Sequence, residues 1–215
     1  RDRAYSEQID ARESERPGLG TLFRVHWRQL LKCVGLVLVF NVTDYMLLTY
    51  MPNYLSVTMG YAETKGLLLI IIVMLVMMPL NVVGGLFSDR LGRRPMIIGA
   101  CVALMLLSVP CMLLIGTGND ALIFLGLMLL GIALVCFTSS MPSTLPALFY
   151  TPVRYSALSI AFNISVSLFG GTTPLITAWL VQKTGDPLVP AYYLMGAALI
   201  GLLTMLTVRE TAGMP

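Results

Sequence analysis

The feature that most constrains the fold of this chain is a long apolar run in its first half. Gly66 to Ser88 contains no charged residue, and its first part reads GLLLIIIVMLVMMPL. A run of about 20 apolar residues is long enough to cross the hydrocarbon core of a bilayer as a helix. The run lacks the alternation of polar and apolar residues that a barrel strand needs, so it predicts a membrane-spanning helix.

The rest of the chain repeats this pattern. We expect membrane spans over approximately residues 30–52, 66–87, 96–115, 121–143, 156–180 and 190–208. Charged residues make up only 12% of the chain, whereas soluble domains carry about 25%. Lipid offers no partner to an unpaired backbone group, so each span must satisfy its own hydrogen bonds. The sequence therefore predicts an all-α integral membrane protein with six transmembrane helices.

Polar segments flank the expected membrane domain, which we place at residues 29–209. Residues 1–28 carry mixed charges without apolar periodicity, which predicts a cytoplasmic linker, and residues 210–215 are expected to begin a cytoplasmic tail. A chain that starts within a linker is expected to be a fragment of a longer protein. With no water-soluble domain on either side, such a chain is expected to act within the bilayer.

The lysines and arginines predict the orientation of the spans. Twelve of the 14 lie before or at the start of span one, in the turns after spans two and four, or after span six, and only Lys65 and Lys183 lie on the other side. Because positive charge accumulates on the cytoplasmic side, both ends of this segment are predicted to be cytoplasmic. The net charge of +3 comes from these loops. It indicates contact with the anionic lipid of the bilayer and not with nucleic acid.

A short charged turn separates spans two and three, and we call it the signature turn, Gly85–Arg94. Its pattern is G-x-x-x-D-R-x-G-R-R, formed by Gly85, Asp89, Arg90, Gly92, Arg93 and Arg94. We expect Gly85 to let two helices approach closely and Gly92 to adopt a positive φ angle. Asp89 is expected to accept hydrogen bonds or to pair with an arginine. Either these contacts gate the cytoplasmic side, or the arginines only anchor the topology.

The signature turn resembles the cytoplasmic signature of the major facilitator superfamily, which follows the second helix and recurs after the eighth. The resemblance implies half of a twelve-helix fold built from two repeats. Residues 1–28 would then be the central linker and the six spans the second repeat. The N-terminal six-helix half would be a missing partner.

Longer strings resemble one group within that superfamily more closely. NVTDYMLLTYMPNYLS, STLPALFYTPVRYSALSIAFNIS and PAYYLM followed by VRETA are similar to the second half of the bacterial proline/betaine proton symporters, of the metabolite:proton symporter group. This resemblance implies uptake of small zwitterionic osmolytes, driven by protons and by alternating access, across the bacterial inner membrane. It also implies that Arg154 belongs to a second loop signature and pairs with Asp89.

Asp44 is the only ionisable residue deep within a predicted span, which makes it a functional candidate. On a helix, Asn41, Asp44 and Tyr45 share one face, which we expect to line a central cavity. Asp44 either binds a proton, pairs with a cationic substrate group, or only hydrogen-bonds to neighbouring helices. It stands where the family resemblance leads us to expect an aromatic residue, so the three roles stay open.

Other residues are further candidates for the cavity and its movement. Thr138 and Asn163 supply polar groups in spans four and five. Aromatic residues of span one either form part of a cage for a quaternary ammonium or pack between helices: Phe40, Tyr45, Tyr50 and Tyr54. Two spans are expected to be interrupted, span two at Pro79 and Asn81 and span five at Gly170, Gly171 and Pro174.

Other classes of protein fit the sequence less well. An intramembrane enzyme needs a nucleophile and a base at membrane depth, yet the sole histidine lies in the expected linker. A channel needs a pore loop, and the outer connections are too short to form one. No cofactor or metal site is expected, because the four cysteines lie in spans as packing residues. The alternative substrate is a carboxylate such as citrate, 2-oxoglutarate or shikimate, but no Lys or Arg lies deep in a span to bind it.

Overall fold

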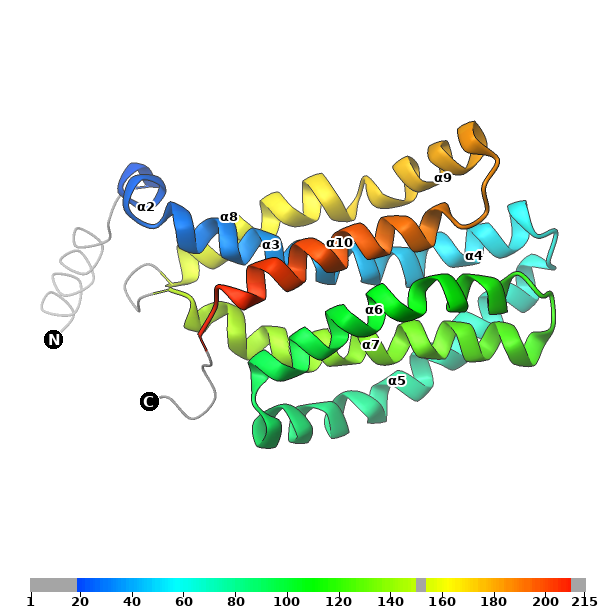
Figure 1. Cartoon of the computed structure of the whole chain (residues 1–215), viewed down its shortest axis with the longest axis horizontal. Helices are drawn as coiled ribbons and strands as arrows, with labels where there is room; N and C mark the ends of the chain where they lie inside the picture. The colour runs from blue at the N-terminus through cyan, green and yellow to red at the C-terminus, as the bar shows by residue number, and fades with distance from the viewer. Residues whose placement is uncertain (1–18, 150–153, 210–215) are drawn as a thin grey trace, which may run out of the picture.

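The computed structural model describes residues 19–149 and 154–209, and the structural statements below refer to these two ranges. Residues 1–18 of the expected linker and the expected tail, 210–215, lie outside them. The described chain is a bundle of helices (Figure 1). In chain order, with η for a π-helical turn, the elements are α2 Leu19–Val25, α3 Trp27–Tyr45, η1 Met46–Tyr50, α4 Met51–Asn53, η2 Tyr54–Thr58, α5 Glu63–Leu91, α6 Arg93–Ile115, α7 Asp120–Ala147, α8 Arg154–Ser165, η3 Val166–Gly170, α9 Thr173–Thr184 and α10 Val189–Leu206.

Six helical segments within the described ranges are long and apolar enough to cross a membrane, which confirms the predicted spans. They are Trp27–Thr58, Glu63–Leu91, Arg93–Ile115, Asp120–Ala147, Arg154–Thr184 and Val189–Leu206. Helix α3 begins at Trp27, two residues before the expected start of the membrane domain at residue 29, and the short helix α2 precedes it. The division into linker, membrane domain and tail stays a prediction. Helix α2 and the last turn of α10 lie at the same end of the bundle (Figure 1), as an even number of spans requires.

Two of the spans are broken helices, and a proline lies next to each break. In span one the π-helical turn η1 precedes Pro52, and the Met51 N–H bonds to the carbonyl of Met46, five residues back. In span five η3 precedes Pro174, and the Gly171 N–H bonds to Val166 O at 3.0 Å. Proline has no N–H and its ring clashes with the carbonyl four residues back. A π turn adds one residue and lets the hydrogen-bonded ladder resume around it.

The expected interruptions are thus only partly correct. The break in span five is confirmed, whereas the break in span one at Pro52 was not anticipated. The interruption expected in span two is wrong, because α5 continues through Pro79 from Glu63 to Leu91. The Asn81 side chain donates to Met77 O at 3.1 Å. The carbonyl that loses its donor at Pro79 is a different one, that of Leu75, four residues before the proline.

The helices pack in a defined order from one flank of the bundle to the other. Helix α5 packs against α7, α7 against α6, α6 against α10, and α10 against α3. Helix α3 then packs against α8 and η3, and it also touches α7. Figure 1 shows α5 along one flank and the α8–α9 segment along the opposite one, with the remaining spans between them.

Glycines set the closest helix contacts in this bundle. A Cβ atom placed on Gly201 of α10 would lie 2.6 Å from Val39 Cγ1 of α3, and one on Gly35 would lie 2.5 Å from Thr204 Oγ1. Between α6 and α7, a Cβ on Gly126 would lie 2.9 Å from the backbone oxygen of Cys111. Apolar tails of lipid give helices no hydrophobic reason to associate. Close backbone approach at small residues is therefore a main source of attraction.

The two flanking spans are the least covered. In both Glu63–Leu91 and Arg154–Thr184, only 22% of the residues in the apolar 18-residue stretch of the span are buried. The corresponding share is 67% in Trp27–Thr58 and 56% in Asp120–Ala147. The flanks therefore present apolar side chains outward, to lipid or to further protein.

The α3–α10 contact can be tested with a matched pair of substitutions on α10. We expect Gly201→Val to lower the thermal unfolding midpoint of the full-length protein in detergent, at a cost of about 1–3 kcal/mol, because the added methyl groups overlap Val39. Gly196→Val is the control, since a Cβ there meets no atom within 4 Å. Equal midpoints for the two variants would contradict this packing.

Candidate functional site

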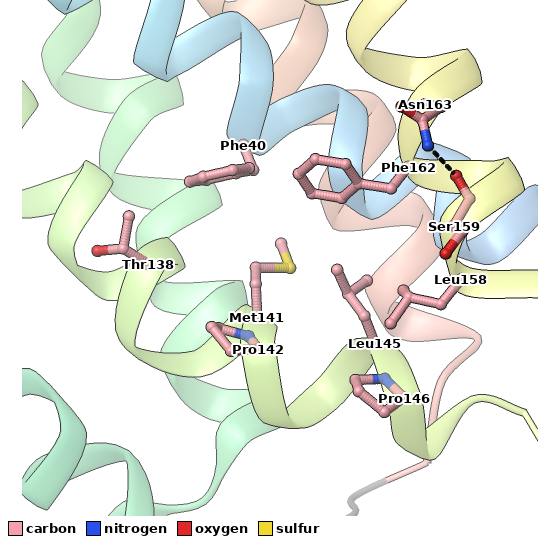
Figure 2. Close-up of a pocket in the computed structure, with 10 residues that line it drawn as sticks. All are labelled: Phe40, Thr138, Met141, Pro142, Leu145, Pro146, Leu158, Ser159, Phe162 and Asn163. Atoms are coloured by element: carbon pink, nitrogen blue, oxygen red, sulfur yellow. Dashed lines mark hydrogen bonds between the residues drawn. The ribbon is translucent and has the colours of Figure 1, made fainter. Parts of the chain in front are cut away.

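A cavity of about 560 Å³ opens between α3, α7 and α8, and we call it the lateral cavity. It is lined by Phe40, Thr138, Met141, Pro142, Leu145, Pro146, Leu158, Ser159, Phe162 and Asn163. Figure 2 shows the rings of Phe40 and Phe162 extending into the space between the three helices, opposite Met141 and Leu145. The lateral cavity lies in the half of the bundle that contains the signature turn, because it uses the last turns of α7 and the first turns of α8.

The two polar candidates Thr138 and Asn163 lie on the wall of the lateral cavity. Their polar groups, however, form hydrogen bonds within the protein. The Thr138 hydroxyl points away from the cavity (Figure 2) and donates to Asn81 Oδ1 of α5 at 2.5 Å. The Asn163 amide donates to Ser159 O at 2.8 Å within its own helix. The cavity wall is therefore mostly apolar, and Thr138 ties α7 to α5.

Several cavity residues were missed by the sequence analysis. Pro142 and Pro146 lie four residues apart on the cavity side of α7, and Phe162 faces them from α8. Residues four positions apart lie on the same face of a helix. The spacing of the two prolines could therefore have predicted that they lie on one side of the span. No comparable signal distinguishes Phe162 from aromatic residues that only pack.

The three candidate residues of span one, Asn41, Asp44 and Tyr45, have different surroundings in the structure. Asn41 is buried, with 3% of its surface exposed, and its Nδ2 has no hydrogen-bond acceptor within the described residues. Asp44 is half-buried, and the described part of the chain gives its carboxylate neither a hydrogen bond nor an ion pair. Tyr45 packs on η3, since a Cβ on Gly170 would lie 2.9 Å from its ring. Asn41 and Asp44 thus carry unused polar groups, and Tyr45 joins two helices.

The four aromatic candidates do not gather around one space. Phe40 lines the lateral cavity, whereas Tyr54 lines a different pocket at the far end of the bundle. Tyr50 and Tyr54 are both buried and their ring centroids are 5.8 Å apart. The expected cage is therefore not assembled by the described residues, because these side chains are distributed along more than three turns of one broken helix.

The signature turn has the expected sharp geometry, but a different glycine makes the close contact. Gly92 has φ 99° and ψ 150° and ends α5 where α6 begins, so its positive φ is confirmed. A Cβ on Gly85 would meet no described atom within 4 Å, whereas one on Gly84 would lie 3.0 Å from Ser139 Oγ of α7. One turn further on, the hydroxyls of Ser88 and Ser140 are 3.1 Å apart. Gly84, one residue earlier than expected, is therefore where α5 approaches α7 closely.

The arginines of the signature turn bind the ends of neighbouring helices. Arg93 donates to Ser143 O of α7, and Arg94 donates to Leu206 O at the end of α10, both at 3.2 Å. Lys32 of α3 donates to Thr207 O next to it, at 3.1 Å. A helix carries partial negative charge at its C-terminal carbonyls, where a cation is favourable. These cations therefore link the ends of four helices, α3, α6, α7 and α10, beyond any effect on orientation.

The expected pair between Asp89 and Arg154 is not formed in this conformation. Asp89 and Arg90 are exposed, and no ion pair joins Asp89 to a described residue. Arg154, the first residue of α8, instead donates from Nε to Phe149 O at 3.3 Å. The role of both residues in gating stays a prediction.

A six-helix bundle with two broken helices, a cavity near their breaks and a charged turn after the second span is the architecture of one repeat of a major facilitator fold. The family model described as "Sugar (and other) transporter" matches residues 1–215. The chain belongs to this transporter family of the major facilitator superfamily, and it is a multi-pass membrane protein.

The chain is similar to several curated bacterial proteins. It is 53% identical over 190 residues to a proline/betaine transporter of Salmonella typhimurium. The aligned residues make up 88% of this chain and 38% of the relative. It is 52% identical over 190 residues to a proline/betaine transporter of Escherichia coli, with the same coverage. It is 51% identical over 213 residues to a glycine betaine/proline/ectoine/pipecolic acid transporter of Dickeya dadantii, or 97% of this chain and 42% of the relative. The chain therefore spans about two fifths of the length of these relatives.

The unpaired amide of Asn41 generates a testable prediction. An unsatisfied buried donor costs about 1–3 kcal/mol, so we expect Asn41→Leu to raise the thermal unfolding midpoint of the full-length protein and to lower its substrate uptake. Thr43→Val is the control, because the Thr43 hydroxyl is buried and already donates to Val39 O at 2.8 Å. If Asn41→Leu destabilises the protein as much as the control does, Asn41 has a structural partner.

Proposed function

We propose that this chain forms the second six-helix repeat of a proton-coupled transporter that takes up proline and glycine betaine. The observation that carries the proposal is the identity of 51–53% to relatives named as transporters of these compounds, over 190 to 213 residues of this chain. The relatives are named as transporters, so the enzyme alternative gains no support from them. The transported substrate is a small zwitterion and the driving partner is the proton.

The bundle lies in the inner membrane of a bacterium with both described ends cytoplasmic. The distribution of lysine and arginine supports this orientation, with twelve residues on one side and two on the other. In this orientation the signature turn and the lateral cavity belong to the cytoplasmic half of the bundle. The braces from Arg93 and Arg94 then hold the cytoplasmic ends of α7 and α10.

A second six-helix half completes the transporter. The chain spans only 38–42% of these relatives, which leaves room for a second repeat of similar size. The sparsely buried flanks, α5 and α8–α9, supply apolar surface against which that half packs. Rocking of one half against the other exposes the substrate site to each side in turn.

Asp44 and Asn41 supply the polar contacts that the lateral cavity lacks. An amide donor without an acceptor suits the carboxylate of a zwitterion, and an unpaired carboxylate suits its ammonium group or a proton. Neither residue lines the lateral cavity itself, but both follow Phe40, whose ring does, by four positions or fewer. The apolar wall then contacts the ring of proline or the methyl groups of betaine.

The substrate class is tested by uptake of labelled proline, glycine betaine and citrate into cells that express the full-length protein, with and without an osmotic upshift. We expect uptake of proline and glycine betaine and none of citrate, because no Lys or Arg lies deep in the spans to bind a second carboxylate. Uptake of citrate in place of the zwitterions would favour the alternative, a carboxylate symporter.

The substitution Asp44→Asn distinguishes between two roles of Asp44, proton binding and binding of the cationic group of the substrate. We expect proton-driven uptake to fall at least about tenfold, the effect of losing roughly one charge-assisted contact, at equal abundance in the membrane. Exchange of internal for external substrate needs no net proton movement. If exchange survives, Asp44 carries the proton, and if exchange is lost as well, Asp44 binds the substrate. Unchanged uptake in both assays would leave only a structural role.

Asp89→Asn tests the gating role of the signature turn. The side chain is exposed, so we expect membrane insertion and thermal stability to be unchanged while uptake becomes slower. Glu63→Gln is a matched control, since it removes an exposed carboxylate at the other end of the same helix. If the Asp89→Asn variant takes up substrate as fast as the control, Asp89 has no role in gating. The signature turn would then only hold the helix ends together and set the orientation in the membrane.

A further inference from the structure

A second pocket lies at the end of the bundle opposite the signature turn, and we call it the distal pocket. Its volume is about 600 Å³, and it is formed by the end of span one, the α6–α7 turn and the α9–α10 turn. It is lined by Tyr54, Thr58, Met59, Met112, Leu113, Gly116, Thr117, Asp186, Pro187 and Leu188. None of these residues lines the lateral cavity, so the distal pocket is a separate site.

The distal pocket contains a carboxylate without a compensating cation. Asp186 is half-buried, its Oδ1 accepts a hydrogen bond from the Leu188 N–H at 2.8 Å, and no described Lys or Arg forms an ion pair with it. The nearest cation along the chain, Lys183, lies over the ring of Trp179 at 4.9 Å. A partly desolvated carboxylate favours a cation that enters the pocket, because less water screens the interaction there.

The remaining lining suits an organic cation better than an inorganic one. Tyr54 contributes an aromatic side chain to the lining, and Met59 and Met112 contribute soft, polarisable thioethers. A metal ion would require several oxygen ligands around one point. Within the described ranges, no three His, Cys, Asp or Glu side chains converge in that way. Methylated ammonium groups are cationic, weakly hydrated and apolar on their surface, and they match this lining.

Short glycine-containing turns border the distal pocket. Gly118 and Gly185 have φ angles of 72° and 68°, and each lies in one of the turns that border the pocket. Gly60, with φ 63°, lies in the turn that follows Met59. Glycine adopts such backbone conformations without strain, so all three connections can be short and sharply bent. The Tyr54 hydroxyl lies 3.5 Å from Pro187 O, which joins span one to the α9–α10 turn.

We propose that the distal pocket binds methylated ammonium compounds through Asp186 and Tyr54, as a capture site on the outer side that substrate occupies before it enters the central site. This proposal rests on the proposed function for its orientation and for the identity of the substrate. Asp186 attracts the ammonium group, the Tyr54 ring and the methionine side chains contact its methyl groups, and the Thr58 hydroxyl is available to the carboxylate of a zwitterion. Capture in this pocket raises the occupancy of the entrance without taking part in translocation.

The test uses the full-length protein and the substitution Asp186→Asn, which keeps the Oδ1 acceptor for Leu188 and removes only the charge. We expect the KM for glycine betaine uptake to rise about tenfold with little change in kcat, as for the loss of one partly screened charge contact. Asp120→Asn is the matched control, because Asp120 is an exposed carboxylate at the same end whose partner is the Tyr61 hydroxyl. Its KM should equal that of the wild type.

Tetramethylammonium provides a probe that has the cation but no carboxylate. It should inhibit wild-type uptake from outside by competition, and Asp186→Asn should weaken this inhibition about tenfold. Binding of tetramethylammonium to the purified full-length protein, measured by calorimetry for wild type and variant, tests the pocket even if glycine betaine is not transported. Equal binding by both proteins, or a lower kcat with unchanged KM, would overturn the proposal. Absence of glycine betaine uptake by the wild type, with tetramethylammonium binding that depends on Asp186, would overturn the proposed function and keep the pocket.

Discussion

The hydrogen bonding of the backbone inside the membrane is the constraint on which this structure depends. Lipid supplies no donors or acceptors, so each span must pair its own N–H and C=O groups. Where Pro52 and Pro174 remove a donor, the chain responds with the π turns η1 and η3. Around η3, the hydroxyls of Thr172 and Thr173 donate to carbonyls four residues back, those of Leu168 and Phe169. The two broken helices therefore keep most of their backbone pairing through π turns, and they are easier to bend at these points.

The positions of these breaks connect the backbone to the candidate site. Tyr45, the last residue of α3 before η1, packs on Gly170, the last residue of η3. One aromatic contact thus joins the two weakened turns at the same depth of the bundle. Asn41 and Asp44 lie just before the first break and Asn163 just before the second, so movement at the breaks would move the polar groups of the site. The braces from Arg93, Arg94 and Lys32 hold the ends of the helices at the signature-turn side.

The sequence was sufficient to predict the spans and their number, because the length of an uncharged run is a property of the chain itself. It was also sufficient for Gly92, since a sharp turn between two long helices needs a positive φ angle. It was not sufficient to distinguish Gly84 from Gly85, because nearly uniform apolar spans do not indicate which face meets another helix. For the same reason it did not reveal that the Thr138 hydroxyl turns toward Asn81, or that Tyr54 lies in a different pocket from Phe40.

Proton-coupled movement of a zwitterion can be measured directly on the purified protein. The purified full-length protein is reconstituted in liposomes with an alkaline interior, and entry of labelled glycine betaine is followed with time. We expect glycine betaine to accumulate inside the liposomes above the outside concentration, and this accumulation to be lost when a protonophore collapses the gradient. Entry that only equalises the two concentrations, or that is unaffected by the protonophore, would show that transport is not coupled to protons.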